Sequence, residues 1–384
     1  MTLKQSTWPG RELSEFDRTL IIASYFGFLP ITAPKITKHD IELTRSCGNH
    51  QHYDAVEKMA VMRMYLEQDL ASLSHPIALV YEKPASRKKF GGHALHFIGS
   101  FSGIAEATLI RATLSILSEE GHKNLRVDIN CIGDRESINT YERELINYVR
   151  KSDENLPDEL RQSIKEDIFN LFRLNAPEAL RLSEAAPSSI TFLSAQSRIY
   201  FKEVLEYIEA LGIEFRLTPK LVGERNHSSH TIFAIKNVED EGSDILAVGY
   251  RYSRLARFLG LRKEIPMAGV NIFSTSSRDT RKRVYKGLPK PKFYLIQLGR
   301  EAKIKTLSLI ELLRSHHIPL HHFLGKDKIT AQLLNAENLR VPYLIIIGQK
   351  EALDNTATIR NVSTRAQDTV SIASLPHYLK NIAL

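Results

Sequence analysis

The chain divides into blocks in which hydrophobic and polar positions follow different periods. Apolar side chains at every second position of residues 125–132 predict a half-buried strand, which Gly133 follows. From 135 to about 211 nearly every position favours helix, and apolar residues recur at helical spacing until Gly212. Residues 1–275 therefore combine strands with one long helical segment.

Shorter elements flank this helical segment on both sides. Before it, the pattern predicts helices over 12–27, 55–73 and 104–120 and strands over 75–81 and 95–101. After it, apolar runs bounded by turn residues predict strands over 214–222, 231–236, 245–252 and 269–273. We assign all of these elements to one domain, residues 1–275.

Residues 276–292 differ from both of their neighbours. They are basic and polar and carry two prolines, so we interpret them as a linker between domains. Beyond them, strands predicted over 293–298, 320–323 and 343–347 alternate with helices, and a hairpin and a terminal helix follow. Strands that alternate with helices predict a small α/β domain with a largely parallel sheet over residues 293–384.

Composition and charge narrow the class of protein. The chain has 384 residues, 43% apolar and 25% charged, which suits a globular protein of two or three domains. Its net charge of +8 is compatible with a polyanion such as RNA. Two cysteines, Cys47 and Cys131, favour a reducing compartment over a disulfide framework. No apolar stretch is long enough to cross a membrane, so we expect a cytoplasmic protein.

Generic catalytic motifs are absent, but a family resemblance is present. The chain has no P-loop, no Rossmann glycine fingerprint, no HExxH and no paired CxxC. The sequence INCIGDRESINTYERELINYV at 129–149 resembles the histidyl-tRNA synthetase family. Further similar segments occur in order, namely FGFLPITAP at 26–34, Arg-x-Tyr-x-Glu at 63–67, the run at 201–222 and residues 293–384.

This resemblance implies a fold, an assembly and a partner. The expected fold is α+β: a class II synthetase-like antiparallel sheet core flanked by helices, with a helical insertion at about 135–212. An α/β domain that resembles the family's anticodon-binding domain should follow at 293–384. The segment that includes Pro34 resembles the dimer-forming first class II motif. The implied state is therefore a homodimer, and the implied partner is tRNA or another structured RNA.

The family's catalytic pattern is altered in the first half of the chain. Class II synthetases activate an amino acid with ATP and need fixed cations, because negative charge develops on phosphate. Arg87 is a candidate for the arginine of the second motif, but His93 replaces the acidic residue that follows. Residues 54–58 replace the Arg-Pro-Glu-x-Thr element that grips the amino group.

The later elements of the pattern are altered as well. In the segment that corresponds to the histidine-specific loop, Gly223 stands at the position of the catalytic arginine, and Arg225 substitutes only if the loop shifts. A third motif at 265–277 lacks its arginine, whereas Arg251 and Tyr252 are kept. We interpret these losses as loss of aminoacylation, and we assign no catalytic residue. A residual ATP or amino-acid pocket would contain Arg87, Arg225, Arg251 and Tyr252.

Histidines and basic residues supply two weaker hypotheses. The pairs His93/His96 and His227/His230 are candidates for a zinc site, although positions three apart on a strand point to opposite faces. We therefore predict no metal. The basic linker residues have two equally supported interpretations: they contact RNA phosphates, or they form a solvated connection between the domains. They are Arg278, Arg281, Lys282, Arg283, Lys286, Lys290 and Lys292.

The favoured hypothesis is a synthetase-like dimer that binds tRNA or another RNA, or a regulatory protein partner, without aminoacylation. One alternative is an active, divergent histidine–tRNA ligase, which would need ATP and Mg²⁺; otherwise we predict no cofactor. The other alternative resembles the regulatory subunit of ATP phosphoribosyltransferase, a synthetase paralogue that usually lacks an anticodon-binding domain. Residues 293–384 weigh against that alternative.

Overall fold

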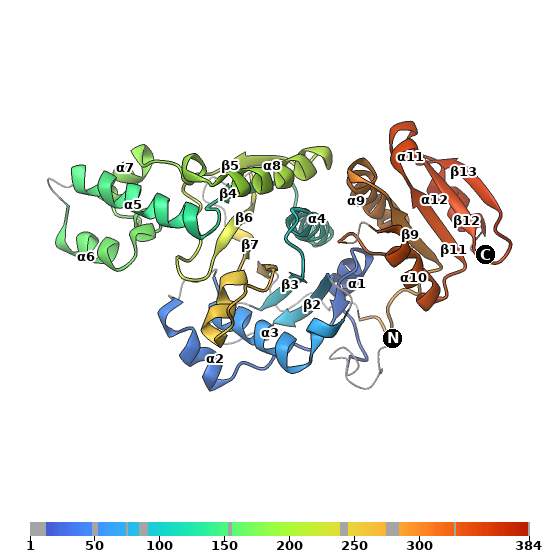
Figure 1. Cartoon of the computed structure of the whole chain (residues 1–384), viewed down its shortest axis with the longest axis horizontal. Helices are drawn as coiled ribbons and strands as arrows, with labels where there is room; N and C mark the ends of the chain where they lie inside the picture. Colours follow the sequence, from blue (N-terminus) through green and yellow to red (C-terminus); the bar gives the residue numbers. More distant parts are fainter. Residues whose placement is uncertain are drawn as a thin grey trace.

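The computed structural model describes residues 13–47, 53–73, 76–83, 91–152, 156–238, 245–273, 284–325 and 328–382. Two sheets organise the chain, and Figure 1 shows an elongated arrangement. A helical lobe lies at one end, an eight-stranded sheet in the middle, and a five-stranded sheet with its helices at the other end. No helix in these described ranges is long and apolar enough to cross a membrane.

The eight-stranded sheet forms the central layer. Its strands, in spatial order, are β1 (Leu29–Pro30), β2 (Ile77–Lys83), β3 (Gly92–Ile98), β8 (Met267–Phe273), β7 (Ile245–Arg251), β6 (Ser229–Asn237), β4 (Leu125–Cys131) and β5 (Phe215–Leu217). The six inner strands pair antiparallel, and only the edge strands β1 and β5 pair parallel to their neighbours. The predicted class II-like antiparallel core is therefore confirmed.

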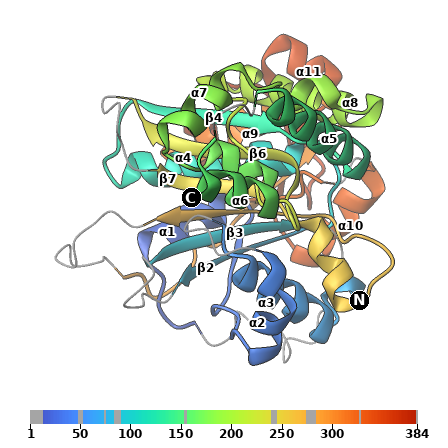
Figure 2. The ribbon, with the colours of Figure 1, turned by 90° about the vertical axis from the view of Figure 1, so that its left-hand side faces the viewer.

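Helices cover both faces of this sheet. On one face lie α1 (Arg18–Tyr25), α4 (Ile104–Glu119) and α8 (Ala195–Ala210), and their apolar side chains share a core with the sheet. On the other face lies α3 (Ala55–Glu67), next to α2 (Lys38–Leu43). Figure 2 shows β2 and β3 between these two helical layers. Each face of the sheet is therefore a buried surface that a different set of helices covers.

The helical lobe is only the first part of the insertion predicted at about 135–212, because α8 packs on the core sheet instead. It contains α5 (Arg135–Lys151), α6 (Asp158–Glu166) and α7 (Pro177–Ala185), with short 3-10 helices η3 (Ile168–Phe172) and η4 (Ser189–Phe192). The helix α5 starts where the Asp134 side chain accepts a hydrogen bond from the Ser137 backbone N–H. A separate apolar core that includes Tyr141 and Phe169 holds the lobe together.

The second sheet belongs to the C-terminal part. Its spatial order is β10 (Leu320–His322), β9 (Phe293–Gln297), β11 (Tyr343–Ile347), β12 (Thr356–Asn361) and β13 (Gln367–Ser371). Helices α9 (Arg300–Ser315), α10 (Ile329–Leu339), α11 (Gln349–Asp354) and α12 (Leu375–Ile382) accompany it. The first three strands are parallel, as predicted, whereas β11 and β12 pair antiparallel. The predicted hairpin is confirmed, because β12 and β13 are antiparallel. Their connection is too short for the crossover that a parallel pair requires.

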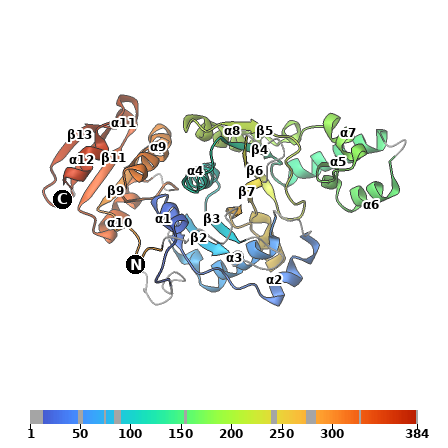
Figure 3. The same ribbon diagram turned by 180° about the vertical axis from the view of Figure 1, so that it is seen from behind.

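The helix α9 joins the two sheets. Glu311 on α9 accepts hydrogen bonds from Arg314, at 2.7 and 2.9 Å, and from Ser115 of α4, at 2.8 Å. Arg111 of α4 also lies 3.0 Å from that carboxylate, and Arg314 donates to Glu119 at 3.0 Å. Figure 3 shows α9 beside α1 and α4. The C-terminal part thus contacts helices α1 and α4, which cover one face of the core sheet.

Several predicted boundaries were wrong. The helix predicted over 12–27 begins only at Arg18, because Asp17 caps it. The helix predicted over 55–73 ends at Glu67, and a 3-10 turn, η2 (Leu70–Ser72), follows. The strand predicted over 214–222 is limited to β5, because Pro219 has no N–H to donate to a neighbouring strand.

Candidate functional site

Three buried aromatic side chains, Tyr81, His96 and Tyr252, are hydrogen-bonded in a row on the face of the core sheet beneath α3. Tyr81 of β2 lies 3.0 Å from His96 Nε2, and Tyr252, just after β7, lies 2.8 Å from His96 Nδ1. The ring of Tyr81 stacks on His96, with centroids 5.4 Å apart and an interplanar angle of 13°. Burial lowers the pKa of His96 well below its ordinary value, with Lys58 contributing, so the imidazole is neutral.

The hydrogen bonds also set the tautomer of His96. Tyr81 donates its single hydroxyl hydrogen to Glu57 Oε1, at 2.7 Å. Its oxygen is therefore the acceptor toward His96, so the proton of the neutral ring lies on Nε2. Nδ1 then accepts from the hydroxyl of Tyr252. Each ring has a fixed partner and a fixed proton, and none of the three side chains is open to solvent.

Two charged residues of α3 complete this polar face. Lys58 Nζ donates to Asn271 Oδ1 of β8 at 2.6 Å, and Glu57 Oε2 accepts from Lys83 Nζ at 2.6 Å. Burial lowers the pKa of Lys58 to about 8, although the Glu57 carboxylate opposes this shift. Burial also acts to raise the pKa of Glu57, but the ammonium groups of Lys58 and Lys83 hold it at about 2.

Local sequence explains why these groups meet. Asp54 caps α3 by accepting from the Glu57 N–H at 3.1 Å, which places Glu57 and Lys58 in the first turn, next to the sheet. Opposite His96, β8 carries Gly269, and a Cβ there would lie 2.7 Å from His96 Nδ1. The glycine therefore leaves the space that the imidazole occupies.

The structure places the three described pocket candidates in different surroundings. Arg251 and Tyr252 are consecutive, so a strand directs them to opposite faces. Arg251 donates to Glu106 of α4 at 2.9 and 3.0 Å and to the Ser100 carbonyl at 2.7 Å, on the face away from α3. Burial acts to lower the pKa of Arg251, but Glu106 raises it above its ordinary value.

The remaining pocket candidates lie elsewhere. Arg225 is in the loop before β6 and donates to Glu142 of α5 at 2.9 and 3.0 Å, so it connects the core to the helical lobe. Arg87 lies outside the described residues. Of the three predicted pocket residues that the structure describes, only Tyr252 therefore belongs to the polar face beneath α3.

The four histidines are also separated. His93 Nε2 contacts Asp17 at 2.6 Å, on the face opposite His96. His227 lies 3.3 Å from the Tyr250 hydroxyl, whereas the ring of His230 packs 4.9 Å from that of Tyr200. Among the residues that the structure describes, no three His, Cys, Asp or Glu side chains are placed to hold a metal ion.

The linker and dimer candidates are only partly described. Lys286, Lys290 and Lys292 are exposed, as RNA contacts would need to be. Pro34 is half-buried in the segment after β1. The other four linker candidates, Arg278, Arg281, Lys282 and Arg283, lie outside the described residues.

Sequence reasoning missed most of the polar face. Glu57 and Lys58 entered only as a departure from a motif, and Tyr81 and Asn271 were not singled out. A usable signal was the charged Glu57-Lys58 pair directly before an apolar helical run. Charges in that position must either face solvent or pair inside, and here they pair inside.

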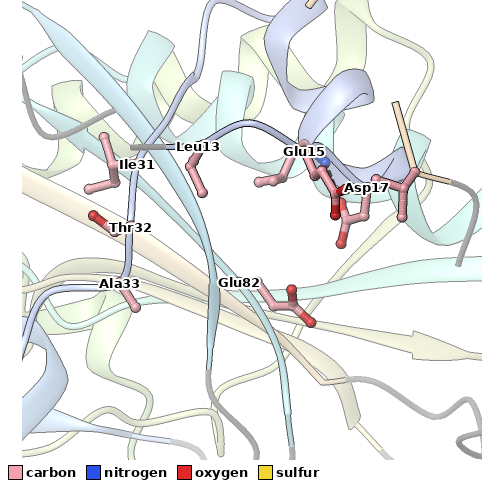
Figure 4. A pocket seen from close by; sticks show the side chains of 9 residues that line it. Leu13, Glu15, Asp17, Ile31, Thr32, Ala33 and Glu82 are labelled. Carbon is pink, nitrogen blue, oxygen red and sulfur yellow. Dashed lines mark hydrogen bonds between the residues drawn. The ribbon is translucent and has the colours of Figure 1, made fainter. Parts of the chain in front are cut away.

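A cavity of about 390 Å³ lies at the β1 edge, apart from this polar face. Carboxylates of Glu15, Asp17 and Glu82 line it together with apolar side chains (Figure 4). The Asp17 carboxylate lies 2.6 Å from His93 Nε2, so it has a hydrogen-bond partner within the fold. The lining is Leu13, Glu15, Asp17, Leu20, Ile31, Thr32, Ala33, Glu82 and Val284.

Known proteins share this architecture. An antiparallel core sheet with a helical lobe and a C-terminal α/β domain is the fold of a class II aminoacyl-tRNA synthetase. Residues 292–382 match the family described as "Anticodon binding domain". The apo histidyl-tRNA synthetase of S. aureus superposes with a TM-score of 0.52 at 21% identity, covering 93% of this chain and 92% of that one. This chain is therefore similar in fold to a histidyl-tRNA synthetase.

Relatives in sequence agree with that assignment. The histidine–tRNA ligase of Bacillus subtilis is 27% identical over 312 residues, which cover 78% of this chain and 72% of the relative. The ligase of Anoxybacillus flavithermus is 26% identical over 341 residues, covering 84% and 80%. The similarity therefore extends well beyond the anticodon-binding domain into the core.

Proposed function

We propose that this chain is a synthetase-like protein that binds tRNA or another structured RNA without aminoacylating it. The observation that carries the proposal is the closed polar face beneath α3. Lys58, His96 and Tyr252 are fully buried there. Lys58 donates to Asn271, and His96 is hydrogen-bonded to Tyr252, so their polar groups have partners within the protein. A substrate amine or nucleotide would have to displace these contacts.

The positions of the remaining arginines support the same proposal. Adenylation needs cations directed at a developing phosphate charge. Arg251 is bound to Glu106 on the opposite face, and Arg225 is bound to Glu142. Neither guanidinium is available beneath α3, so these two residues do not fit a site for ATP and Mg²⁺.

Binding of RNA is proposed from the C-terminal part. Residues 292–382 match an anticodon-binding family, and the neighbouring Lys286, Lys290 and Lys292 are exposed. We further propose a homodimer through the segment around Pro34, and a cytoplasmic location, which the relatives named as tRNA ligases favour.

Two measurements test the proposal. Pure protein should give no histidine-dependent ATP–pyrophosphate exchange, and RNA sequencing of the purified protein should recover enriched tRNA or another defined RNA. Replacing Lys286, Lys290 and Lys292 by Glu should weaken RNA binding and lower the salt slope by about 1 for each phosphate that is no longer neutralised. The matched control replaces the exposed Lys123, Lys151 and Lys165 by Glu.

An active ligase is the second candidate, because the relatives in sequence are named histidine–tRNA ligases. Histidine-dependent exchange above the background of a no-histidine control would establish that activity and defeat the proposal. Recovery of background RNA alone, with equal binding by both lysine variants, would defeat the RNA-binding part.

A further inference from the structure

Lys58 is a primary ammonium group that is completely removed from solvent. Its relative exposure is 0%, and its Nζ lies 2.6 Å from Asn271 Oδ1 and 4.0 Å from Glu57 Oε2. The Tyr252 ring lies 5.9 Å away, within the range of a cation–π contact. Burial of a lysine is costly unless such partners replace water.

The groups around this ammonium are held independently of it. Glu57 is fixed by Tyr81 and Lys83, and Tyr252 is fixed by His96. Asn271 lies within β8, a central strand of the sheet. An amide oxygen, a carboxylate and an aromatic face therefore surround one point, which the Lys58 side chain reaches from α3.

We propose that this face carries a binding site for a primary ammonium group and that Lys58 occupies it as an internal ligand. The inference rests on the proposed function, because it names what fills the polar face in place of a substrate. An external amine competes poorly, since Lys58 is attached to the site and its effective concentration is high. The intact protein therefore takes up no small amine there.

Truncation of the internal ligand exposes the site. Lys58→Ala removes three methylene groups and the ammonium, which together have the size of n-propylammonium. The truncated side chain leaves a cavity whose acceptors and aromatic wall remain. We expect n-propylammonium chloride to raise the Tm of Lys58→Ala in a saturable way, because the ligand binds only the folded state. Sodium chloride at the same concentration corrects for ionic strength.

Matched variants and ligands separate an ammonium site from a plain cavity. n-Propanol has the same size without the charge and should raise the Tm much less. Lys58→Met fills the space and should not respond to either compound. Adding Asn271→Leu to Lys58→Ala removes the amide acceptor and should weaken the amine response by about tenfold or more, which corresponds to loss of one good hydrogen bond to a charged group.

Each result decides the inference. Equal effects of propanol and propylammonium, or no saturable effect on folded Lys58→Ala, would overturn it. If Lys58→Ala is unfolded, the same titration is followed as recovery of far-UV circular dichroism, and failure of recovery overturns it equally. No ATP, histidine or RNA enters this assay. Failure here is therefore distinguishable from a failure of the proposed function, which the exchange and RNA measurements report.

Discussion

Arg251 and Glu106 form a bidentate ion pair whose two side chains are each 1% exposed. The pair joins β7 to α4 on the face of the core sheet that lies away from α3. Tyr252, the next residue, hydrogen-bonds to His96 on the other face. One short segment thus connects both helical layers to the sheet.

Removal of one partner from this pair should be strongly destabilising. Glu106→Gln leaves the Arg251 guanidinium buried with an uncharged neighbour, and the expected loss of unfolding free energy is about 3–5 kcal/mol. Urea unfolding followed by circular dichroism measures it. The matched control is Asp158→Asn, because Asp158 forms an exposed pair with Arg161 at 3.7 Å. That change should stay within about 0.5 kcal/mol.

Replacing both partners tests the same idea from the other side. The double variant Glu106→Leu/Arg251→Met removes both buried charges together, so it should be less destabilised than Glu106→Gln. A double variant at least as unstable as Glu106→Gln would show that packing around the pair, and not its charge, controls stability here.

Stability should rise with pH because of Lys58. Its folded pKa of about 8 lies below the ordinary value of 10.5, so between these values the unfolded chain binds more protons. The contribution of Lys58 to the free energy of unfolding therefore increases as pH rises, by about 2 kcal/mol between pH 7 and pH 9.5. The buried thiols of Cys47 and Cys131, whose pKa values are raised, act in the opposite direction. Charged Glu57, Lys83 and Asp54 also act on Lys58, and Glu57, with a pKa of about 2, does not titrate in this window.

Lys58→Met is the control for that pH dependence. The variant has no amine to titrate, so its urea midpoint should rise less between pH 7 and pH 9.5 than that of the wild type. The comparison ends below pH 10, where unfolded tyrosines begin to ionise. Parallel curves for the two proteins would mean that Lys58 is not the group responsible.

The strand pattern of the core could be predicted from sequence, but the polar face could not. The strand predicted over 245–252 is β7, because alternating apolar residues fix which positions are buried. The contact between Tyr81 and His96 depends on register, since Leu79, not Tyr81, is opposite His96 across β2 and β3. The sequence pattern within one strand does not determine how that strand is aligned with its neighbour.

The misplaced pocket residues show a second limit. The family resemblance grouped Arg251 with Tyr252, although the period of a strand separates neighbouring side chains. A motif shows which residues are neighbours in the sequence. The side of the sheet on which each side chain lies depends on its position in the strand and on where the strand ends. Here β7 ends at Arg251, and Tyr252 still points toward α3.

Glu224 should produce the opposite pH dependence to Lys58. Burial raises its pKa to about 7, against the opposing charge of Arg173, so the folded chain holds a proton that the unfolded chain has lost. The contribution of Glu224 to stability therefore falls as pH rises, by about 2 kcal/mol between pH 5 and pH 7.5. Asp167 is the other charge that acts on Glu224. Four buried histidines whose pKa values are lowered act in the opposite direction, namely His96, His227, His230 and His322.

Glu224→Gln should remove this contribution. The free energy of unfolding of the variant relative to the wild type should therefore rise by about 2 kcal/mol from pH 5 to pH 7.5, which urea unfolding at several pH values measures. Gln keeps the size and polarity of the side chain but cannot ionise. The exposed Glu159→Gln on α6 is the control and should follow the wild type at every pH. A difference between Glu224→Gln and the wild type that stays constant from pH 5 to pH 7.5 would mean that Glu224 does not titrate as proposed.

Gly249 should tolerate no side chain, because β6 packs against it. A Cβ at this position would lie 2.1 Å from Phe233 Cζ and 2.5 Å from Cε1. Phe233 is fully buried, so the ring has no free space to enter. Gly249→Ala should therefore lower the free energy of unfolding by about 1–3 kcal/mol or more through overpacking.

Two further variants isolate that clash. Gly287→Ala adds the same methyl group where nothing lies within 4 Å, so its urea midpoint should stay at the wild-type value. Phe233→Leu shortens the ring that the new methyl group meets, so Gly249→Ala should cost less in that background than in the wild type. Equal costs in both backgrounds would exclude the Phe233 ring as the cause, because a backbone effect of the alanine does not depend on its neighbour's size.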